Sequence, residues 1–230
     1  MLTLGLPQDP ATPLRILCLG SHSDDIEIGC GGTILQLLSR SRKLDVVWVV
    51  LSSDQRRKHE AYSSAELFLG KAERKEIIVE TFRDGFFPFD GPKIKDFFEG
   101  LKKVSPDLIL THNRKDAHQD HRLVAELTWN TFRDHFILEY EIPKYDGDMG
   151  QPSVFVPLES DVCQKKVNYI LDAFQSQRNK RWFAKETFLS LMRLRGMECN
   201  APSGYAEAFH VRKLILQDRG IGSATQFGPR

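Results

Sequence analysis

The stretch of sequence that decides the fold is Gly20-Ser21-His22-Ser23-Asp24-Asp25-Ile26-Glu27-Ile28-Gly29. An apolar run at 16–19 precedes it and a glycine-rich segment at 29–33 follows it, which predicts a buried strand, a polar loop and a helix. In an open α/β sheet, ligands bind beyond the carboxyl ends of the strands, which is where such a loop lies. The loop is therefore the first candidate for a functional site.

The side chains of this loop suit a metal ion. His22 offers a neutral ring nitrogen, and Asp24 or Asp25 adds a hard oxygen. Two adjacent carboxylates repel each other unless a cation neutralises them, so one aspartate could bind the metal while the other transfers protons. The alternative is that these residues only cap the following helix, as Ser and Asp often do.

A second polar stretch favours the metal. It follows the apolar run 108–110 and reads Thr111-His112-Asn113-Arg114-Lys115-Asp116-Ala117-His118-Gln119-Asp120-His121. If both strands belong to one parallel sheet, the two loops share one edge of it. Six side chains can then converge: His22, Asp24, Asp25, His118, Asp120 and His121. Two histidines and one carboxylate are enough for a catalytic zinc site that keeps a position open for water.

At these motifs the chain resembles the LmbE/PIG-L-like N-deacetylases, zinc enzymes that remove an acetyl group from N-acetylglucosamine units. Residues 21–27 match the motif Ala-His-Pro-Asp-Asp-Glu of that family, or a close variant of it, and 118–121 match its motif His-Pro-Asp-His. Weaker similarity reaches Leu69-Gly70, Ser176-Gln177 and 205–209, so the resemblance covers most of the chain.

The motifs also depart from the family. Ser21 stands in place of the usual Ala, and Ser23 and Gln119 in place of two prolines, which loosens the loops because Pro fixes φ. A tyrosine that some members carry just before the second motif is absent, since Asp116 and Ala117 stand there. Any help that this tyrosine gives to the oxyanion must come from elsewhere or be missing.

The resemblance implies a metal-dependent hydrolysis of an N-acetyl group. It makes His22, Asp25 and His121 the metal ligands, with zinc as the ion, although two histidines and one carboxylate also suit Fe(II). It makes Asp24 the general base for a water whose pKa zinc lowers to about 7.

The resemblance also gives roles to the rest of the second motif. It makes His118 the electrostatic partner or general acid, and either His118 or Asp24 could protonate the leaving amine. Asp120 orients a histidine, or caps the helix expected to begin near His121, or both. Candidate substrate contacts are Arg57, Asn113, Arg114 and Lys144. Glu60 lies on one helix face with Arg57 and could bond a sugar hydroxyl or Arg57 itself.

The order of patterns predicts an α/β fold, a Rossmann-like and mostly parallel sheet with flanking helices and a C-terminal elaboration. We expect one domain over 1–230, with its core at about 14–142 and the elaboration at about 143–219. The first helix is expected to start near residue 29, and a late strand at 209–216 is expected at the sheet edge. The phenylalanines of 82–89 could wall a sugar pocket or simply pack under a long loop.

Composition narrows the class of protein. The chain has 230 residues, 41% of them hydrophobic, and a formal net charge of +1, so nothing argues for a nucleic-acid partner. Its four cysteines lack paired spacing and fit reduced thiols. We find no signal peptide and no run near the ~20 apolar residues that cross a bilayer, and expect a cytoplasmic protein. A homo-oligomer is possible.

Two other functions remain open from the sequence. A nucleotide-binding Rossmann enzyme would explain the glycines, but G-x-G-x-x-G is absent at the first strand–helix turn. A non-catalytic metal- or sugar-binding protein is the second, since fold alone does not give function. For the deacetylase, a small soluble N-acetylated glycoside or a nucleotide sugar is the preferred substrate.

Overall fold

The computed structural model describes residues 3, 5–6, 12–40 and 42–215. Seven strands form one sheet in the order β3-β2-β1-β4-β5-β7-β6. The first five run parallel, and β7 pairs antiparallel with both β5 and β6. The strands are β1 (Leu14–Gly20), β2 (Leu44–Val50), β3 (Arg74–Val79), β4 (Leu108–His112), β5 (Phe136–Tyr140), β6 (Val154–Pro157) and β7 (Ala206–Val211).

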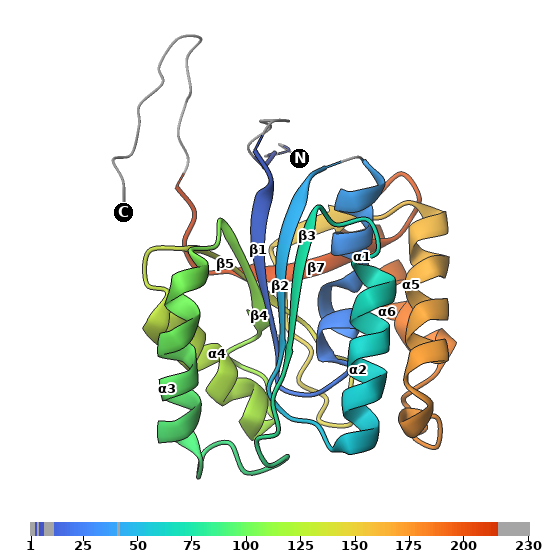
Figure 1. Cartoon of the computed structure of the whole chain (residues 1–230). Helices are drawn as coiled ribbons and strands as arrows, with labels where there is room; N and C mark the ends of the chain where they lie inside the picture. The colour runs from blue at the N-terminus through green and yellow to red at the C-terminus, as the bar shows by residue number, and fades with distance from the viewer. Residues whose placement is uncertain (1–2, 4, 7–11, 41, 216–230) are drawn as a thin grey trace, which may run out of the picture.

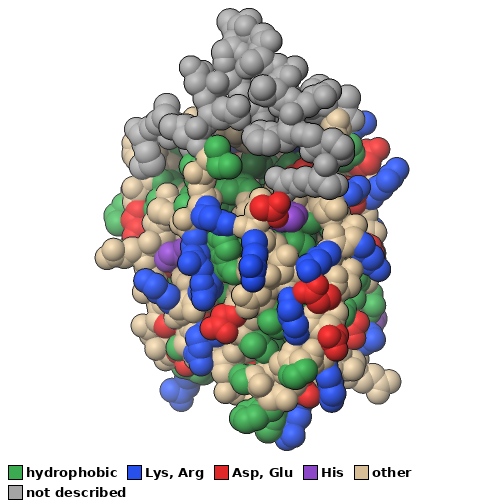
Figure 2. Space-filling model, turned by 90° about the vertical axis from the view of Figure 1, so that its left-hand side faces the viewer, with side chains coloured by type: hydrophobic (Ala, Val, Ile, Leu, Met, Phe, Trp, Pro, Cys, Tyr) green, Lys and Arg blue, Asp and Glu red, His purple; other side chains and the backbone are tan. Residues whose placement is uncertain are grey.

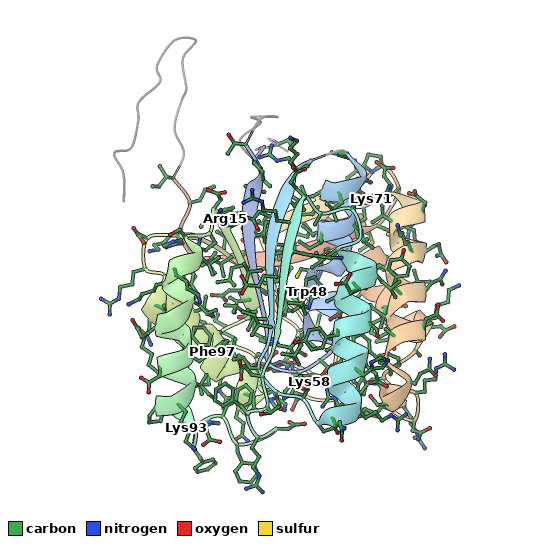
Figure 3. All side chains as sticks on the ribbon, in the orientation of Figure 1. Arg15, Trp48, Lys58, Lys71, Lys93 and Phe97 are labelled. Carbon is green, nitrogen blue, oxygen red and sulfur yellow. The ribbon has the colours of Figure 1, made fainter. Side chains whose placement is uncertain are left out.

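Helices cover both faces of the sheet, so each face has its own core (Figure 1). On one face lie α1 (Asp25–Ser39), α2 (Gln55–Phe68), α5 (Ser160–Ala173) and α6 (Lys185–Glu198); on the other lie α3 (Gly91–Leu101) and α4 (Gln119–Thr131). Short 3-10 turns follow α3 and α5, at η1 (Lys102–Val104) and η2 (Gln175–Gln177). Figure 3 shows Trp48 and Phe97 on opposite sides of the sheet, one in each layer. The predicted mostly parallel α/β sheet is confirmed.

The centre of the sheet positions the two polar loops. β1 and β4 are parallel neighbours, with Ile16 opposite Leu108 and Cys18 opposite Leu110. The chain leaves β1 for a helix on one face and β4 for a helix on the other face, so the two loops lie at a switch point of the sheet. In open α/β sheets the crevice that binds ligands lies outside the strand ends at such a point, and we call the region between the two loops the crevice. Strands buried on both faces read as continuous apolar runs, as β1 does. The expected convergence of the two loops at one sheet edge is therefore confirmed.

Two expected boundaries are wrong. The first helix begins at Asp25, four residues earlier than expected, so the first motif itself forms the helix start. The glycines that we took for that start serve close packing instead: a Cβ on Gly29 would lie 2.2 Å from the Tyr140 ring, and one on Gly31 would lie 2.5 Å from Phe68. The late strand spans 206–211 and lies inside the sheet, because β6 pairs with its outer side.

A buried ion pair fixes α1 to the last strand. Glu207 of β7 accepts hydrogen bonds from the backbone N–H groups of Gly32 (2.7 Å) and Thr33 (2.6 Å) in the middle of α1. Lys166 of α5 lies 2.5 Å from Glu207 and donates to the Ile28 carbonyl at 2.6 Å. These contacts give Glu207, for which the sequence offers no role, a structural one.

The surface carries charges of both signs. Figure 2 shows Lys and Arg side chains interspersed with Asp and Glu on the side of the molecule formed by α3 and α4. Within the described part of the chain, none of the helices has the length and apolar character that a membrane crossing requires. Figure 3 labels Lys58 and Lys93 near the carboxyl ends of the parallel strands, the end that holds the two polar loops.

Candidate metal centre

Three of the predicted side chains meet at one point of the crevice. Nδ1 of His22 lies 3.2 Å from Nε2 of His121 and 3.4 Å from Oδ2 of Asp25, and the last two atoms are 3.5 Å apart. All three residues are buried. Donors about 2.0–2.1 Å from a tetrahedral ion lie roughly 3.3–3.4 Å from one another. The predicted ligand set therefore has the spacing and the chemistry that fit zinc, without identifying the ion.

The turn that follows β1 gives the two aspartates different surroundings. Oδ2 of Asp25 accepts a hydrogen bond from the backbone N–H of His22 at 2.7 Å, which aims this carboxylate at the ligand point. Asp24 occupies the N-cap of α1, yet its side chain makes no hydrogen bond to the helix. The alternative that the aspartates only cap the helix therefore does not account for Asp24.

Asp24 directly precedes Asp25 in the chain, and Arg57 of α2 reaches its carboxylate. Oδ1 of Asp24 is 3.5 Å from Nη2 of Arg57. Burial and the charge of Asp25 raise the pKa of Asp24, while Arg57 and His22 oppose the rise. The pKa of Asp25 lies well below its usual range, because the neighbouring His121 and His112 outweigh the opposing effect of burial. The surroundings thus move the pKa values of the two adjacent carboxylates in opposite directions.

Asp116 holds the ring of His121 from behind. Its Oδ2 lies 2.9 Å from Nδ1 of His121, so Nδ1 carries the proton and Nε2 presents its lone pair to the ligand point. Burial, together with the charge of His112, lowers the pKa of His121 to about 4. Oδ1 of Asp116 accepts from the backbone N–H of His118 at 2.8 Å and lies 3.1 Å from Nζ of Lys144.

Two carboxylates face the other ring nitrogen of His22. Nε2 of His22 lies 3.1 Å from Oδ1 of Asp84 and 3.3 Å from Oδ2 of Asp120. Asp120 also accepts hydrogen bonds from the backbone N–H groups of Gly85 (2.7 Å) and Phe87 (3.2 Å). Asp120 therefore connects the His22 ring with the loop after β3. Burial lowers the pKa of His22, but the hydrogen bonds with Asp120, Asp25 and Asp84 outweigh it and hold that pKa well above its ordinary value.

His118, rather than Asp120, is the N-cap of α4. The helix begins at Gln119, and Nδ1 of His118 accepts the backbone N–H of Asp120 at 3.2 Å. Burial and the charge of His22 lower the pKa of His118, which favours a neutral ring. With Nδ1 as acceptor, the ring proton of His118 is on Nε2.

The predicted substrate contacts are not equivalent. Arg57 bridges Asp24 and Asp84. Asn113 accepts the backbone N–H of Lys115, and Arg114 is exposed. Lys144 is engaged within the protein, since both oxygens of Asp148 lie 2.6–2.7 Å from its Nζ. Glu60 does not bond Arg57. It accepts hydrogen bonds from the backbone N–H (2.9 Å) and the hydroxyl (2.5 Å) of Ser176, and so holds η2 in place.

The aromatic loop divides into two parts. Phe87 is fully buried and its ring stacks at 6.2 Å from that of His22, while Phe82 packs edge-on against Phe87. Phe86 and Phe89 are exposed, at 37% and 77%. Packing therefore accounts for the first pair, and the second pair leaves apolar surface on the loop that Asp120 anchors.

Three residues at the site could not be given a role there from the sequence alone. His112 ends β4, stacks on His121 at 3.9 Å between ring centres and accepts the N–H of Ser21 at 3.0 Å. Asp116 stands in the second polar stretch, five residues before His121, and its spacing could have been noticed. Asp84 is far from His22 in sequence, and no local pattern connects the two.

Comparison with known families gives one match. The model of the PIG-L family, described as GlcNAc-PI de-N-acetylase, matches residues 17–132. This range contains nearly all of β1, then β2 to β4, both polar loops and the whole of α4, and hence all six motif residues at the crevice.

Solved structures share the fold over most of the chain. A conserved protein from Thermus thermophilus is 19% identical, with a TM-score of 0.72, over 89% of this chain and 97% of that one. N,N'-diacetylchitobiose deacetylase from Pyrococcus horikoshii is 20% identical, with a TM-score of 0.68, over 89% and 86%. A 4-carboxy-2-hydroxymuconate hydratase from Pseudomonas putida is 18% identical, with a TM-score of 0.68, over 89% and 98%. Because a deacetylase and a hydratase share this fold, the reaction must be argued from the site.

Proposed function

Because this chain belongs to the PIG-L family of de-N-acetylases, we propose that it is a metal-dependent hydrolase that removes the acetyl group from an N-acetylglucosamine-type sugar conjugate. The observation that carries the proposal is the buried triad of His22, Asp25 and His121, with an uncapped carboxylate, Asp24, beside it. Metal binding needs the triad alone, and the pKa of Asp24, which burial and Asp25 raise, suits a group that exchanges protons.

The triad would hold zinc, for which Fe(II) is the alternative. When bound, zinc would supply a water with a pKa of about 7 and would polarise the acetyl carbonyl. The protein prepares the triad for this by fixing the ring protons. Asp116 accepts the Nδ1 proton of His121, and Asp120 and Asp84 accept the Nε2 proton of His22. Nε2 of His121 and, once its own proton has left, Nδ1 of His22 can then present lone pairs to the ion.

Asp24 acts as general base and then as general acid. It takes a proton from the attacking water and later gives it to the amide nitrogen, so that free amine and acetate leave and Asp24 returns to its ionised form. Its raised pKa suits both steps, and Arg57 keeps the pKa from rising further.

His118 supports the carbonyl oxygen as a neutral donor. Its Nδ1 accepts from the Asp120 backbone, which leaves the Nε2–H group free to donate a hydrogen bond to the developing oxyanion. This N–H group would take the place of the tyrosine that this chain lacks. Because a neutral His118 would keep its Nε2 proton in this hydrogen bond, we assign the protonation of the leaving amine to Asp24 rather than to His118.

We assign the sugar to the crevice in front of Arg57, where Arg57 can exchange its contact with Asp84 for a sugar hydroxyl. Asn113 and Arg114 remain candidate contacts on the opposite loop, whereas Lys144 supports Asp116 instead. A small soluble glycoside or a nucleotide sugar, encountered in the cytoplasm, is the substrate we propose.

The test is release of acetate and free amine from a panel of substrates. We would incubate the zinc-loaded chain with N-acetylglucosamine, N,N'-diacetylchitobiose and UDP-N-acetylglucosamine, with His121→Ala as the matched control. Release from at least one substrate by the wild type, and from none by the control, is the expected result. No release from any member at full metal occupancy would count against the proposed function and favour a binding role.

A further inference from the structure

The outer side of His22 carries a second set of metal-binding groups. His22, Asp84, His118 and Asp120 each place one nitrogen or oxygen within 4.8 Å of those of the others. Asp84 and Asp120 approach Nε2 of His22 at 3.1 and 3.3 Å, spacings like those of the inner triad. The inner triad uses Nδ1 of His22, so the two sets share one ring but no donor atom.

We propose that these four residues form a second, weaker cation site, and that an ion bound there inhibits the deacetylase. The inhibitory part rests on the proposed function, whereas the site itself does not. Two imidazoles and two carboxylates are a donor set that suits zinc and similar divalent ions.

The charge of this outer set favours a cation. Two carboxylates converge on the single Nε2–H group of His22. Among the described residues, the only other cation in contact with these carboxylates is Arg57, which lies 3.4 Å from Oδ2 of Asp84. Asp120 is fully buried, where its charge depends on the hydrogen bonds that it accepts and on nearby positive charge. A divalent ion would neutralise both carboxylates at once.

The outer set is also open to solvent. The side chain of Asp84 is 57% exposed, whereas those of Asp25 and His121 are 5% and 4% exposed. An ion can therefore reach Asp84 without displacing the inner ligands.

The two sites should fill in order. An ion at the outer site would replace the Nε2 proton of His22, which is released to solvent, so that the ring bridges two ions as an imidazolate. The outer ion would also face the ion already bound on the far side of the same ring. Both effects weaken the outer site relative to the inner one, so it fills only after the inner triad is occupied.

Occupation of the outer site would stop turnover by removing two groups from the reaction. His118 would bind the ion instead of donating to the carbonyl oxygen. Asp120 would no longer accept the proton of His22.

Metal counting on the full chain tests the site directly. The metal-stripped protein is dialysed against rising concentrations of zinc alone, and bound zinc is measured by atomic emission. We expect one tight ion and a second, weaker ion for the wild type. Asp84→Asn should keep the tight ion and weaken the second at least tenfold. The matched control is Asp90→Asn, in the same loop, whose carboxylate pairs with exposed Lys93 and should leave both ions unchanged.

Acetate release measured over the same zinc range adds the functional test. We expect the wild type and Asp90→Asn to lose activity as the second ion binds, while Asp84→Asn loses it only at zinc concentrations at least tenfold higher, relative to its own maximum. A wild type that saturates at one ion, or a second ion that Asp84→Asn leaves unchanged, would overturn the site. Two ions that bind as expected in a chain that releases no acetate would support the site and count against the proposed function instead.

Discussion

At the scale of single residues, the adjacent Asp24 and Asp25 differ in their contacts and in the direction of their pKa shifts. Asp25 is held by the His22 backbone and surrounded by histidines, so it stays ionised. The side chain of Asp24 makes no hydrogen bond to the helix that it precedes, its pKa is raised, and it lies 3.5 Å from Arg57. The motif predicts that the pair divides the roles of ligand and base, and we base the proposed assignment on these different surroundings.

Replacing the base should separate chemistry from metal binding. In Asp24→Asn we expect the zinc content to stay at the wild-type level and kcat to fall by roughly 10²–10⁴-fold, the usual contribution of general acid–base catalysis. Zinc analysis and acetate release on the same sample check this. Undiminished kcat in the variant would exclude Asp24 as the base.

Removing the carboxylate behind His121 should weaken the metal itself. Asp116→Asn can no longer accept the Nδ1 proton as an anion, and we expect zinc affinity to fall by about 10–100-fold, as for similar supporting carboxylates. Competition with a chelator measures the affinity. Asp146→Asn, on the exposed part of the nearby loop, is the control and should bind zinc like the wild type. Equal affinities of Asp116→Asn and the wild type would contradict the role of Asp116.

At the scale of elements, α1 depends on partners that are far away in sequence. Its glycines make room for Tyr140 and Phe68, and Glu207 bonds two of its backbone N–H groups. Because these contacts come from β5, α2 and β7, the sequence around α1 could predict the helix but not where it starts. The apolar runs at 16–19 and 108–110 predicted the two central strands, β1 and β4, while the position of β7 within the sheet depends on pairing that no local pattern encodes.

Breaking the buried pair that holds α1 should be costly. Lys166→Met leaves Glu207 buried without its cation, and we expect the free energy of unfolding to fall by roughly 3–5 kcal/mol. Urea unfolding followed by circular dichroism measures it. The control is Lys75→Met, which removes a solvent-exposed pair with Glu66 and should cost about 0–1 kcal/mol. Similar losses in the two variants would mean that the Lys166–Glu207 pair does not act as a buried pair.

At the scale of the whole molecule, the function depends on the strand order. β1 ends at Gly20 and β4 begins only at Leu108, yet the two strands pair at the centre of the sheet. Parallel pairing could be expected from the βα alternation, so the convergence of the six motif residues was predictable. The place of Asp84 at the site could not be predicted, because this residue reaches His22 only through the packing of the loop after β3 on the second motif.

The assembled site should bind metal with the release of one proton. In the metal-free chain the raised pKa of His22 keeps this ring protonated, with a proton on Nδ1 where the ion would bind, while His121, with its pKa of about 4, is already neutral. Zinc affinity should therefore fall about tenfold for each pH unit below the His22 pKa and level off above it. Calorimetric titration in two buffers of different ionisation enthalpy counts the protons. Release of none, or of two at pH values well above 4, would contradict this account of the site.

The most direct test of the central claim is acetate release by the metal-stripped chain as zinc is added back one equivalent at a time, on a substrate identified from the panel. We predict no release without metal and a rise to a maximum at one zinc per chain, the capacity of the inner triad of His22, Asp25 and His121. Release that continues undiminished after the metal has been removed would contradict the claim that this chain is a metal-dependent deacetylase.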